Sequence, residues 1–276
     1  MSVLRMKHEA DMARLSSRQH LARGERDPDF VRALARGLSV LECFDPEHGA
    51  MTLSEVAARV GLTRGSTRRL LLTLQHLGFL GSDGRKFFLR PRVLKLGYGF
   101  LSVLPVWSAA QPTIAEVARH TNESCSVAIL DGFEIVYVAR QPAKRILHDY
   151  IPVGTRYPAH ATSMGKVLLA GLAEDDLAPL FAKGPLPRLT PKTITDVDAL
   201  KREIAHTRDA GYAINDEEIE VGLRSIAVPI RDHSGATCAA INVSAPAARV
   251  SVEQLRAWLP ELRRAAESIS LLLTHR

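Results

Sequence analysis

Cysteine, aromatic residues and long apolar runs are all scarce in this chain. Its three cysteines lie far apart among 276 residues, which indicates neither a disulfide framework nor a cysteine-based zinc site. No stretch approaches the roughly 18–20 uninterrupted apolar residues of a membrane span, and the first residues lack the apolar core of a secretory signal. We therefore expect a cytoplasmic protein with reduced, buried thiols, and its length suits two domains.

The motifs of the common enzyme classes are also missing. The sequence contains no GxSxG, HExxH, Walker or GxGxxG motif. No histidine follows the acidic run at 217–220 at ligand spacing, which favours a helix cap or a surface acid cluster over a metal site. Ser163, His160 and Asp149 can be combined on paper into a hydrolytic triad, but such trios arise by chance. We predict that the protein is not an enzyme and holds no cofactor or metal.

Positive charge, by contrast, is present and unevenly distributed. Residues 1–106 hold 17 Lys and Arg against 10 Asp and Glu, whereas the whole chain holds 36 against 30. Within 59–95 there are nine basic residues and a single acid, Asp83. A domain that only needs to be soluble mixes its charges, whereas a surface that displaces counterions from phosphates is basic. The charge distribution therefore indicates nucleic-acid binding in the first part of the chain.

Residues 53–77 have the pattern of a helix-turn-helix. Apolar residues within 53–60 recur at helical spacing, and Ser54 is placed to cap the start of that helix. Gly61 supplies the turn, because glycine tolerates a left-handed backbone, and Thr63 is expected to cap the second helix. The inner face of the second helix is predicted to carry Thr67, Leu70, Leu71, Leu74 and Leu77.

A basic hairpin is predicted directly after the second helix. The runs 79–82 and 85–89 are strand-like, and Asp83-Gly84 between them is a strong signal for a tight turn, so the motif is winged. A charged helix face is most often only solvated, but the wing and the charge distribution favour DNA. Small residues let a recognition helix approach the duplex, and arginines read guanine edges or bind phosphate. The predicted DNA-binding residues are Thr63, Arg64, Gly65, Ser66, Arg68, Arg69, Arg85 and Lys86.

Composition and periodicity divide the chain into four parts. Residues 1–28 are expected to form a flexible arm, and 29–90 the DNA-binding domain. Residues 91–111 are expected to form a linker, and 112–276 a separate domain. The linker begins with an amphipathic helix at 91–104 that Pro105 is expected to stop.

Strands and helices alternate in the last part of the chain. Strands that pair through short turns, with helices packed outside, predict an α+β domain with an antiparallel sheet. One further helix, amphipathic, is predicted at 30–44, and the remaining predicted elements lie in residues 112–276. They are strands at 124–130, 134–139, 225–231 and 237–244, and helices near 163–172, 174–182, 196–209 and 251–273.

Four segments resemble the IclR family of bacterial transcriptional regulators. They are LSEVAARVGLTRGSTRRLLLTLQHLGFL (53–80), VGTRYPAHATSMGKVLLAGL (153–172), GYAINDEEIEVGLRSIAVPIRD (211–232) and AAINVSAP (239–246). Within the family, DPDFVRALARGLSVLECF and the segment from VARQPAKRI onward resemble the branch that regulates protocatechuate, 4-hydroxybenzoate and β-ketoadipate pathways. The resemblance implies operator DNA as a partner, a GAF-like effector-binding domain, a homodimer or dimer of dimers, and control of aromatic-acid catabolism.

The resemblance also implies where an effector binds. A pocket is expected between the start of the helix at 163, the loop before it and the inner faces of the last strands. Asn215 and Asn242 stand where some family members have Asp and Ser, so the effector's identity is not inherited, and a neutral Asn215 suits an anion. Carried over by position, the effector-binding residues are Ile146, Asp149, Tyr157, Ser163, Met164, Asn215, Leu223, Ser225, Asn242 and Ser244.

A ligand carboxylate needs a cationic partner, and the sequence offers several without ranking them. Any of these side chains can instead form a structural ion pair. The favoured function is a regulator that binds operator DNA and senses a small organic acid, aromatic or dicarboxylic. The alternatives are a C-terminal domain that only dimerises and, less favoured, a hydrolase-like enzyme. The candidate cations are Arg140, Arg145, His148, Arg156 and Arg224.

Overall fold

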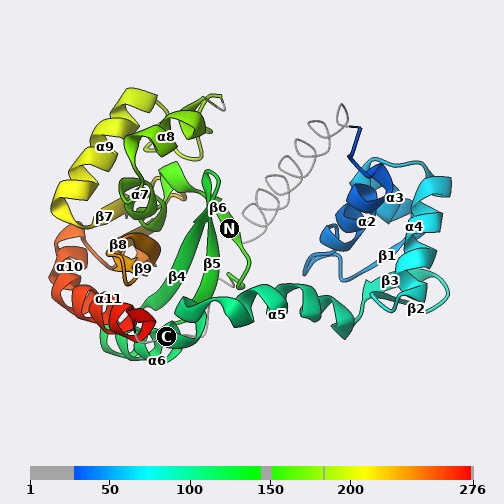
Figure 1. Ribbon diagram of the computed structural model, residues 1–276, viewed down its shortest axis with the longest axis horizontal. Coiled ribbons are helices and arrows are strands. Elements are labelled where there is room, and N and C mark those ends of the chain that lie inside the picture. The colour runs from blue at the N-terminus through cyan, green and yellow to red at the C-terminus, as the bar shows by residue number, and fades with distance from the viewer. Residues whose placement is uncertain (1–27, 144–150, 183, 275–276) are drawn as a thin grey trace. The chain divides into compact units, whose positions relative to one another are not determined.

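The computed structural model describes residues 28–143, 151–182 and 184–274, which form two compact units (Figure 1). The first unit ends at Phe100 and the second begins at Leu101. All but the last residue of the expected flexible arm at 1–28 lies outside the described residues. The sequence-based expectation of a mixed α+β protein with an N-terminal DNA-binding fold is confirmed.

Three helices form the body of the first unit. They are α2 (Arg32–Glu42), α3 (Leu53–Val60) and α4 (Arg64–His76), and all three were expected from the apolar periodicity. Gly61 joins α3 to α4 with a φ of 69°, in the left-handed region that glycine adopts without strain. Apolar side chains from the helices and the adjoining strands make one small core of Val40, Met51, Val56, Leu71, Leu74 and Leu80.

Two details of these helices differ from the prediction. The cap of α3 is Thr52, not Ser54: its hydroxyl accepts the Glu55 N–H, and the Glu55 carboxylate accepts the Thr52 N–H at 2.7 Å. Leu77, expected on the inner face of α4, is 44% exposed because the helix has ended before it. Both errors arise at helix ends, where sequence patterns define boundaries poorly.

The wing has one strand more than the sequence predicted. Strands β2 (Leu80–Ser82) and β3 (Lys86–Leu89) form the expected hairpin, and β1 (Ala50–Thr52) pairs with the other edge of β3. A run of three residues is too short to show the alternation of a strand. The antiparallel sheet β1-β3-β2 therefore ties the residues that precede α3 to the wing.

The helical stretch after the wing continues past Pro105. It consists of a 3₁₀ turn η1 (Pro91–Val93), α5 (Leu94–Val103) and α6 (Pro105–Thr121). The helix before Pro105 ends at Val103, as predicted, but the sequence missed that Pro105 begins a second helix: it occupies the first turn of α6, where a missing N–H costs nothing. In the described part of the chain no single helix is long and apolar enough to cross a membrane, although η1 with α5 and α6 meet that test when combined.

A six-stranded antiparallel sheet is the centre of the second unit. Its strand order is β6-β5-β4-β9-β8-β7, and the predicted hairpins β4–β5 and β8–β9 form its middle. The two strands that the sequence did not predict, β6 and β7, are short and lie at the edges. The strands are β4 (Ser124–Asp131), β5 (Glu134–Gln141), β6 (Arg156–Pro158), β7 (Ala213–Asp216), β8 (Leu223–Arg231) and β9 (Thr237–Pro246).

Helices cover both faces of this sheet. One face packs against α6 and α11 (Leu259–Thr274), and the other against α7 (Ser163–Ala170), which follows the 3₁₀ turn η2 (Ala159–Ala161). Helices α8 (Glu174–Phe181) and α9 (Val197–Ala210) lie on the α7 side (Figure 1). The predicted single helix at 251–273 is broken at Trp258 into α10 (Val252–Ala257) and α11.

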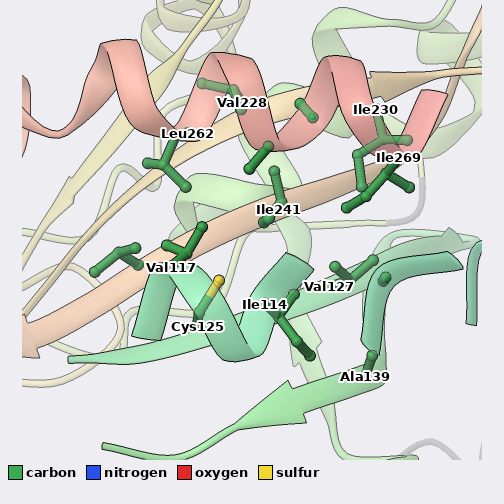
Figure 2. Packing of buried hydrophobic residues seen from close by; sticks show 14 of the residues in the cluster. Ile114, Val117, Cys125, Val127, Ala139, Val228, Ile230, Ile241, Leu262 and Ile269 are labelled. Carbon is green, nitrogen blue, oxygen red and sulfur yellow. The ribbon is translucent and has the colours of Figure 1, made fainter. Parts of the chain in front are cut away.

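The sheet face under α6 and α11 is entirely apolar in its interior. Figure 2 shows Leu262 and Ile269 of α11 among Val228, Ile230 and Ile241 of the sheet, with Ile114 and Val117 of α6 in the same cluster. The five side chains from α11 and the sheet are at most 1% exposed. Because tightly packed apolar residues leave no room for a ligand, this face holds the domain together and a site has to lie elsewhere.

Candidate DNA-binding surface and effector site

The outer face of α4 carries exposed arginines. The Thr63 hydroxyl caps the helix by accepting the Ser66 N–H. Arg64, Arg68 and Arg69 are exposed. No atom lies within 4 Å of the position that a Cβ on Gly65 would occupy. None of the three arginines forms an ion pair with a described residue. The buried side of the helix is formed by Thr67, Leu71 and Leu74, so the packing turns the arginines outward.

The wing adds two more exposed cations. Arg85 and Lys86 are both exposed, and their backbone N–H groups donate to the Asp83 carboxylate at 2.9 and 2.7 Å. These hydrogen bonds hold the pKa of Asp83 below its ordinary value. The carboxylate of Asp83 therefore fixes the turn, and the cationic side chains remain available to an anionic partner.

Two other arginines of the basic segment have structural partners in the chain. Arg59 donates to the Cys43 carbonyl at 3.1 Å and pairs with Asp45. Arg92, at the start of the helical stretch after the wing, donates to the Leu77 carbonyl and lies 5.0 Å from the centre of the Phe79 ring. Both residues are among the nine basic residues of 59–95, but some of their N–H groups donate to partners within the chain.

Helix α7 is buried along its whole length. All eight of its residues are buried, and Thr162 caps its start by accepting the Gly165 N–H at 3.0 Å. A Cβ on Gly165 would lie 2.1 Å from the Ala159 carbonyl oxygen, so any larger residue would force α7 away from η2. The small residue in this segment is thus required by close packing.

The first residues of α7 contact the sheet through polar groups. The Ser163 hydroxyl lies 2.7 Å from the Ser225 hydroxyl of β8, and both residues are buried. Met164 is 1% exposed and belongs to the core on this side. The structure therefore brings three of the predicted effector residues together at one end of α7.

The sheet beneath this end of α7 carries two neighbouring rows of polar side chains. One row crosses three strands as Arg140, Ser126 and Asn242, which are direct cross-strand partners. The other crosses as Ser124, Ser244, Ser225 and Asn215. Directly paired residues point to the same face, and Asn242 pairs with Ala227 of the α7-side core. Both rows therefore lie on the face that α7 covers.

The two asparagines in these rows differ in how they are hydrogen-bonded. The Asn215 amide donates to the Ala161 carbonyl, and its oxygen accepts the Glu218 N–H at 3.1 Å. Asn242 is 3% exposed, and its Oδ1 has no hydrogen-bond partner among the described residues. A buried acceptor without a protein partner is rare, and this distinguishes Asn242 from Asn215.

The remaining predicted effector residues are more dispersed. Tyr157 of β6 is half-buried against Tyr137, with ring centres 5.9 Å apart. Leu223 begins β8 opposite Pro246 and is also half-buried. Ile146 and Asp149 lie outside the described residues, as do the candidate cations Arg145 and His148.

The structure distinguishes the remaining candidate cations from one another. Arg156 pairs with Asp131 and Glu134 at 2.7 and 2.9 Å. Arg224 pairs with Asp216 and donates to the carbonyls of residues 247 and 250. Arg140 is the described candidate whose side chain lies over the polar rows on the α7 side.

Sequence reasoning missed a buried ion pair in this region. Lys166 of α7 is 1% exposed, and its Nζ lies 2.6 Å from the Glu218 carboxylate and 3.2 Å from that of Glu203. Burial raises the pKa of Glu218, and the charge of Lys166 opposes that rise. The acidic run at 217–220 was expected to be a cap or a surface cluster, which is wrong for Glu218. It is buried because its partner is a lysine 52 residues away.

The geometry does not assemble the hydrolytic triad considered from the sequence. Ser163 is bonded to Ser225, whereas the Nε2 of His160 lies 3.0 Å from the Pro187 carbonyl oxygen. Asp149 lies outside the described residues. Within the described chain, no group of three His, Cys, Asp or Glu residues is placed to hold a metal ion.

These features define a winged helix-turn-helix DNA-binding protein with a second, α+β domain. The family model of the IclR helix-turn-helix domain matches residues 33–84, and that of the C-terminal domain of bacterial IclR transcriptional regulators matches residues 98–271. The chain belongs to the IclR family of bacterial transcriptional regulators.

Curated relatives place the chain near one branch of this family. It is 38% identical to the Pca regulon regulatory protein of Pseudomonas putida, over 88% of this chain and 84% of that one. It is 36% identical to the p-hydroxybenzoate hydroxylase transcriptional activator of Acinetobacter baylyi, over 92% of this chain and 96% of that one. These relatives are named as transcriptional regulators, in agreement with the prediction that the chain is not an enzyme. Their names also confirm the predicted branch of the family.

Solved structures agree with the fold. A protein from Rhodococcus sp. RHA1 is 49% identical with a TM-score of 0.79, covering 88% of this chain and 98% of its own. An IclR homologue from Microbacterium hydrocarbonoxydans, solved in complex with 4-hydroxybenzoate, is 30% identical with a TM-score of 0.77. That match covers 87% of this chain and 98% of the homologue.

Proposed function

We propose that this protein regulates an aromatic catabolic operon by binding operator DNA and responding to a small organic acid. The observation that carries the proposal is the pair of polar rows beneath α7, in a domain whose opposite sheet face is apolar. A domain that only dimerises would not need two rows of polar side chains between its sheet and α7. The names of the relatives, and the 4-hydroxybenzoate complex of one of them, support an aromatic acid.

In this proposal the parts of the chain have separate tasks. Residues 29–90 bind DNA in the cytoplasm through the face of α4 and the wing, 91–111 link the domains, and 112–276 bind the acid. Effector contacts are assigned to the start of α7 and to the polar rows, chiefly Ser163 and Asn242. The eight predicted DNA-binding residues keep that role, because seven of them are exposed and Ser66 is half-buried.

Self-association belongs to the same proposal. No residue of α5 is buried, and most of its large apolar side chains are exposed, among them Leu94 and Val103 at 73% and Tyr98 at 63%. An apolar helix in this state is expected to be covered by a partner, and a second copy of the chain fits a two-fold operator. Two winged domains would then contact half-sites about one helical turn, ~34 Å, or a multiple of it apart.

An operator gel shift tests the proposal. The DNA upstream of the protein's own gene is titrated with protein, alone and with protocatechuate, 4-hydroxybenzoate or β-ketoadipate. We expect a specific complex whose apparent affinity changes with at least one acid. A specific complex that none of the acids affects would favour the alternative in which the second domain only dimerises. Absence of any specific complex would contradict the assignment of operator DNA upstream of the gene.

A further inference from the structure

Helix α4 ends in a motif that leaves the Leu77 carbonyl to a partner outside the helix. Gly78 follows the helix with a φ of 76°, and the N–H groups of Gly78 and Phe79 donate to the carbonyls of Gln75 and Leu74. These are the two hydrogen bonds of a Schellman motif, which satisfies carbonyls of the last helical turn. The carbonyl of Leu77, the residue that caps α4, takes no part in either bond.

Arg92 supplies that partner from the start of the linker. Its guanidinium donates to the Leu77 carbonyl and lies 5.0 Å from the centre of the Phe79 ring. The same side chain covers Gly78, since a Cβ on that glycine would lie 3.6 Å from Nη1 of Arg92. A cation is favourable at the C-terminus of a helix, because the carbonyl groups there carry a partial negative charge. Arg92 therefore contacts three successive residues at the end of the recognition helix.

A backbone hydrogen bond also joins the start of the linker to the residues that follow α4. The Arg90 N–H donates to the Phe79 carbonyl at 2.8 Å, and Pro91 has no N–H to donate. No residue of η1 or α5 is buried, and none belongs to the apolar core of the first unit. One backbone hydrogen bond can act as a pivot, whereas a second contact two residues further along fixes a direction. The Arg92 side chain therefore determines how η1 is oriented against the end of α4.

We propose that Arg92 is a positioning residue that fixes the recognition helix to the linker, so that α4 turns with the linker when the second domain binds its acid. A helix transmits a movement only to an element that is firmly attached to it. Without the Arg92 contacts the linker can move while α4 keeps its place. The inference rests on the proposed function and adds which side chain carries the response into the DNA-binding domain. In the sequence Arg92 is only one of the nine basic residues of 59–95.

The test has to separate positioning by Arg92 from a direct contact of its charge with DNA. Arg92 is exposed, so its removal can also remove a phosphate contact. A phosphate contact strengthens operator binding with and without the acid alike, and it cancels in the ratio of the two affinities. Loss of a positioning residue changes that ratio. The quantity to measure is therefore the factor by which an acid changes operator affinity, which is about 5–150-fold in typical allosteric proteins.

The central variant is Arg92→Gln, and Lys95→Gln is its matched control. Both remove one exposed positive charge from the same helical stretch, and of the two it is Arg92 that contacts the end of α4. Fluorescence anisotropy of the full-length proteins on the DNA upstream of the gene gives the affinities, without acid and with protocatechuate, 4-hydroxybenzoate or β-ketoadipate. We expect Arg92→Gln to reduce the wild-type factor to its square root or less, and Lys95→Gln to keep the wild-type factor.

A second measurement tests the contact itself, without DNA or acid. The backbone N–H groups of Phe79 and Arg90 are hydrogen-bonded where η1 meets the end of α4. If Arg92 holds this junction together, Arg92→Gln should speed hydrogen exchange of both amides, because the junction opens locally more often. Lys95→Gln should leave both exchange rates at their wild-type values. Circular dichroism of each variant establishes that it is folded before either experiment.

The outcomes separate this inference from the proposed function. If Arg92→Gln keeps the wild-type factor, or exchanges its Phe79 and Arg90 amides at the wild-type rates, Arg92 does not position α4 and the inference is overturned while regulation by an acid stands. If Lys95→Gln lowers the factor as much as Arg92→Gln does, the lost charge and not the contact is responsible, and the inference fails. If the wild type forms no specific complex that an acid changes, the proposed function fails first and the inference falls with it.

Discussion

Helices α4 and α7 begin in the same way and differ in everything that follows. Each starts after a threonine whose hydroxyl accepts the N–H of the third residue along, Thr63 for α4 and Thr162 for α7. α4 then exposes arginines that have no ion-pair partner in the described chain, whereas α7 is buried on all sides and its lysine is paired internally. The same cap therefore begins a helix whose cations face solvent and a helix whose cation is buried and paired. The packing around each helix, and not its cap, determines the difference.

The largest expected effect concerns the buried charge of α7. Lys166→Met leaves the Glu218 carboxylate buried without its partner, and breaking a buried pair from one side costs about 3–5 kcal/mol. We expect the free energy of unfolding of the second domain to fall by that amount in urea titrations. Lys192→Met removes a half-exposed lysine that pairs with Asp216 and Glu217, and it should cost far less because water screens exposed pairs. Equal losses for the two variants would contradict the comparison.

The exposed charge of α4 should act on DNA binding instead of stability. Arg68→Ala or Arg69→Ala is expected to weaken operator binding by about 1–3 kcal/mol if the arginine reads a base. If the arginine contacts only phosphate, its removal should instead reduce the slope of log affinity against log salt concentration by about one unit. Fluorescence anisotropy at several salt concentrations distinguishes the two cases. Arg202→Ala, which removes an exposed arginine of α9, is the control. If the Arg68 or Arg69 variant binds operator as tightly as this control does, that arginine has no role at the operator.

The two capping threonines provide a smaller and more direct comparison. Loss of a helix cap costs about 0.5–2 kcal/mol, and the cost depends on whether water can replace the hydroxyl. Thr63 is exposed, so Thr63→Ala should lie near the lower end; Thr162 is 7% exposed, so Thr162→Ala should lie near the upper end. Thermal or urea unfolding of each variant measures the difference. A Thr63 variant that is the less stable of the two would reverse the interpretation.

The smallest expected effect is a pH dependence next to α7. Burial lowers the pKa of His160 below its ordinary value of 6.5, the charge of Lys166 adds to this, and the Pro187 carbonyl acts against it. The unfolded chain therefore takes up a proton near pH 6.5 while the folded chain does not, so stability is lost as the pH falls below that value. His160→Gln should flatten the melting temperature profile between pH 6.5 and lower values. His206→Gln, on the exposed side of α9, should leave the profile as it is.

Local sequence signals predicted the elements whose contacts are close in the chain. The winged hairpin followed from Asp83-Gly84, the turn of the helix-turn-helix from Gly61, and the hairpins β4–β5 and β8–β9 from alternation. The elements that were missed are short: β1, β6 and β7 have three or four residues, too few for a period to show. The start of α6 was missed because proline both ends and begins helices.

The effector site was harder to predict because its contacts are distant in the chain. The Lys166–Glu218 pair and the Ser163–Ser225 contact join residues 52 and 62 positions apart, and nothing local marks either of them. The resemblance to the family placed Ser163, Ser225 and Asn242 near one another, but it could not show which residues are already satisfied. Which side chains find hydrogen-bond partners depends on how the strands are paired, and the pairing register is known only from the structure of the sheet.

The proposed function requires that acid binding on the α7 side of the sheet is coupled to DNA binding by α4, and reciprocity tests this coupling most directly. If an acid changes the affinity of the protein for its operator by some factor, operator DNA must change the affinity for that acid by the same factor. The measurement is acid titration calorimetry of the full-length protein, free and saturated with operator. We predict two different affinities whose ratio equals the one found in the DNA-binding experiment. One acid affinity, identical with and without operator, would show that the two sites are not coupled and would contradict the account.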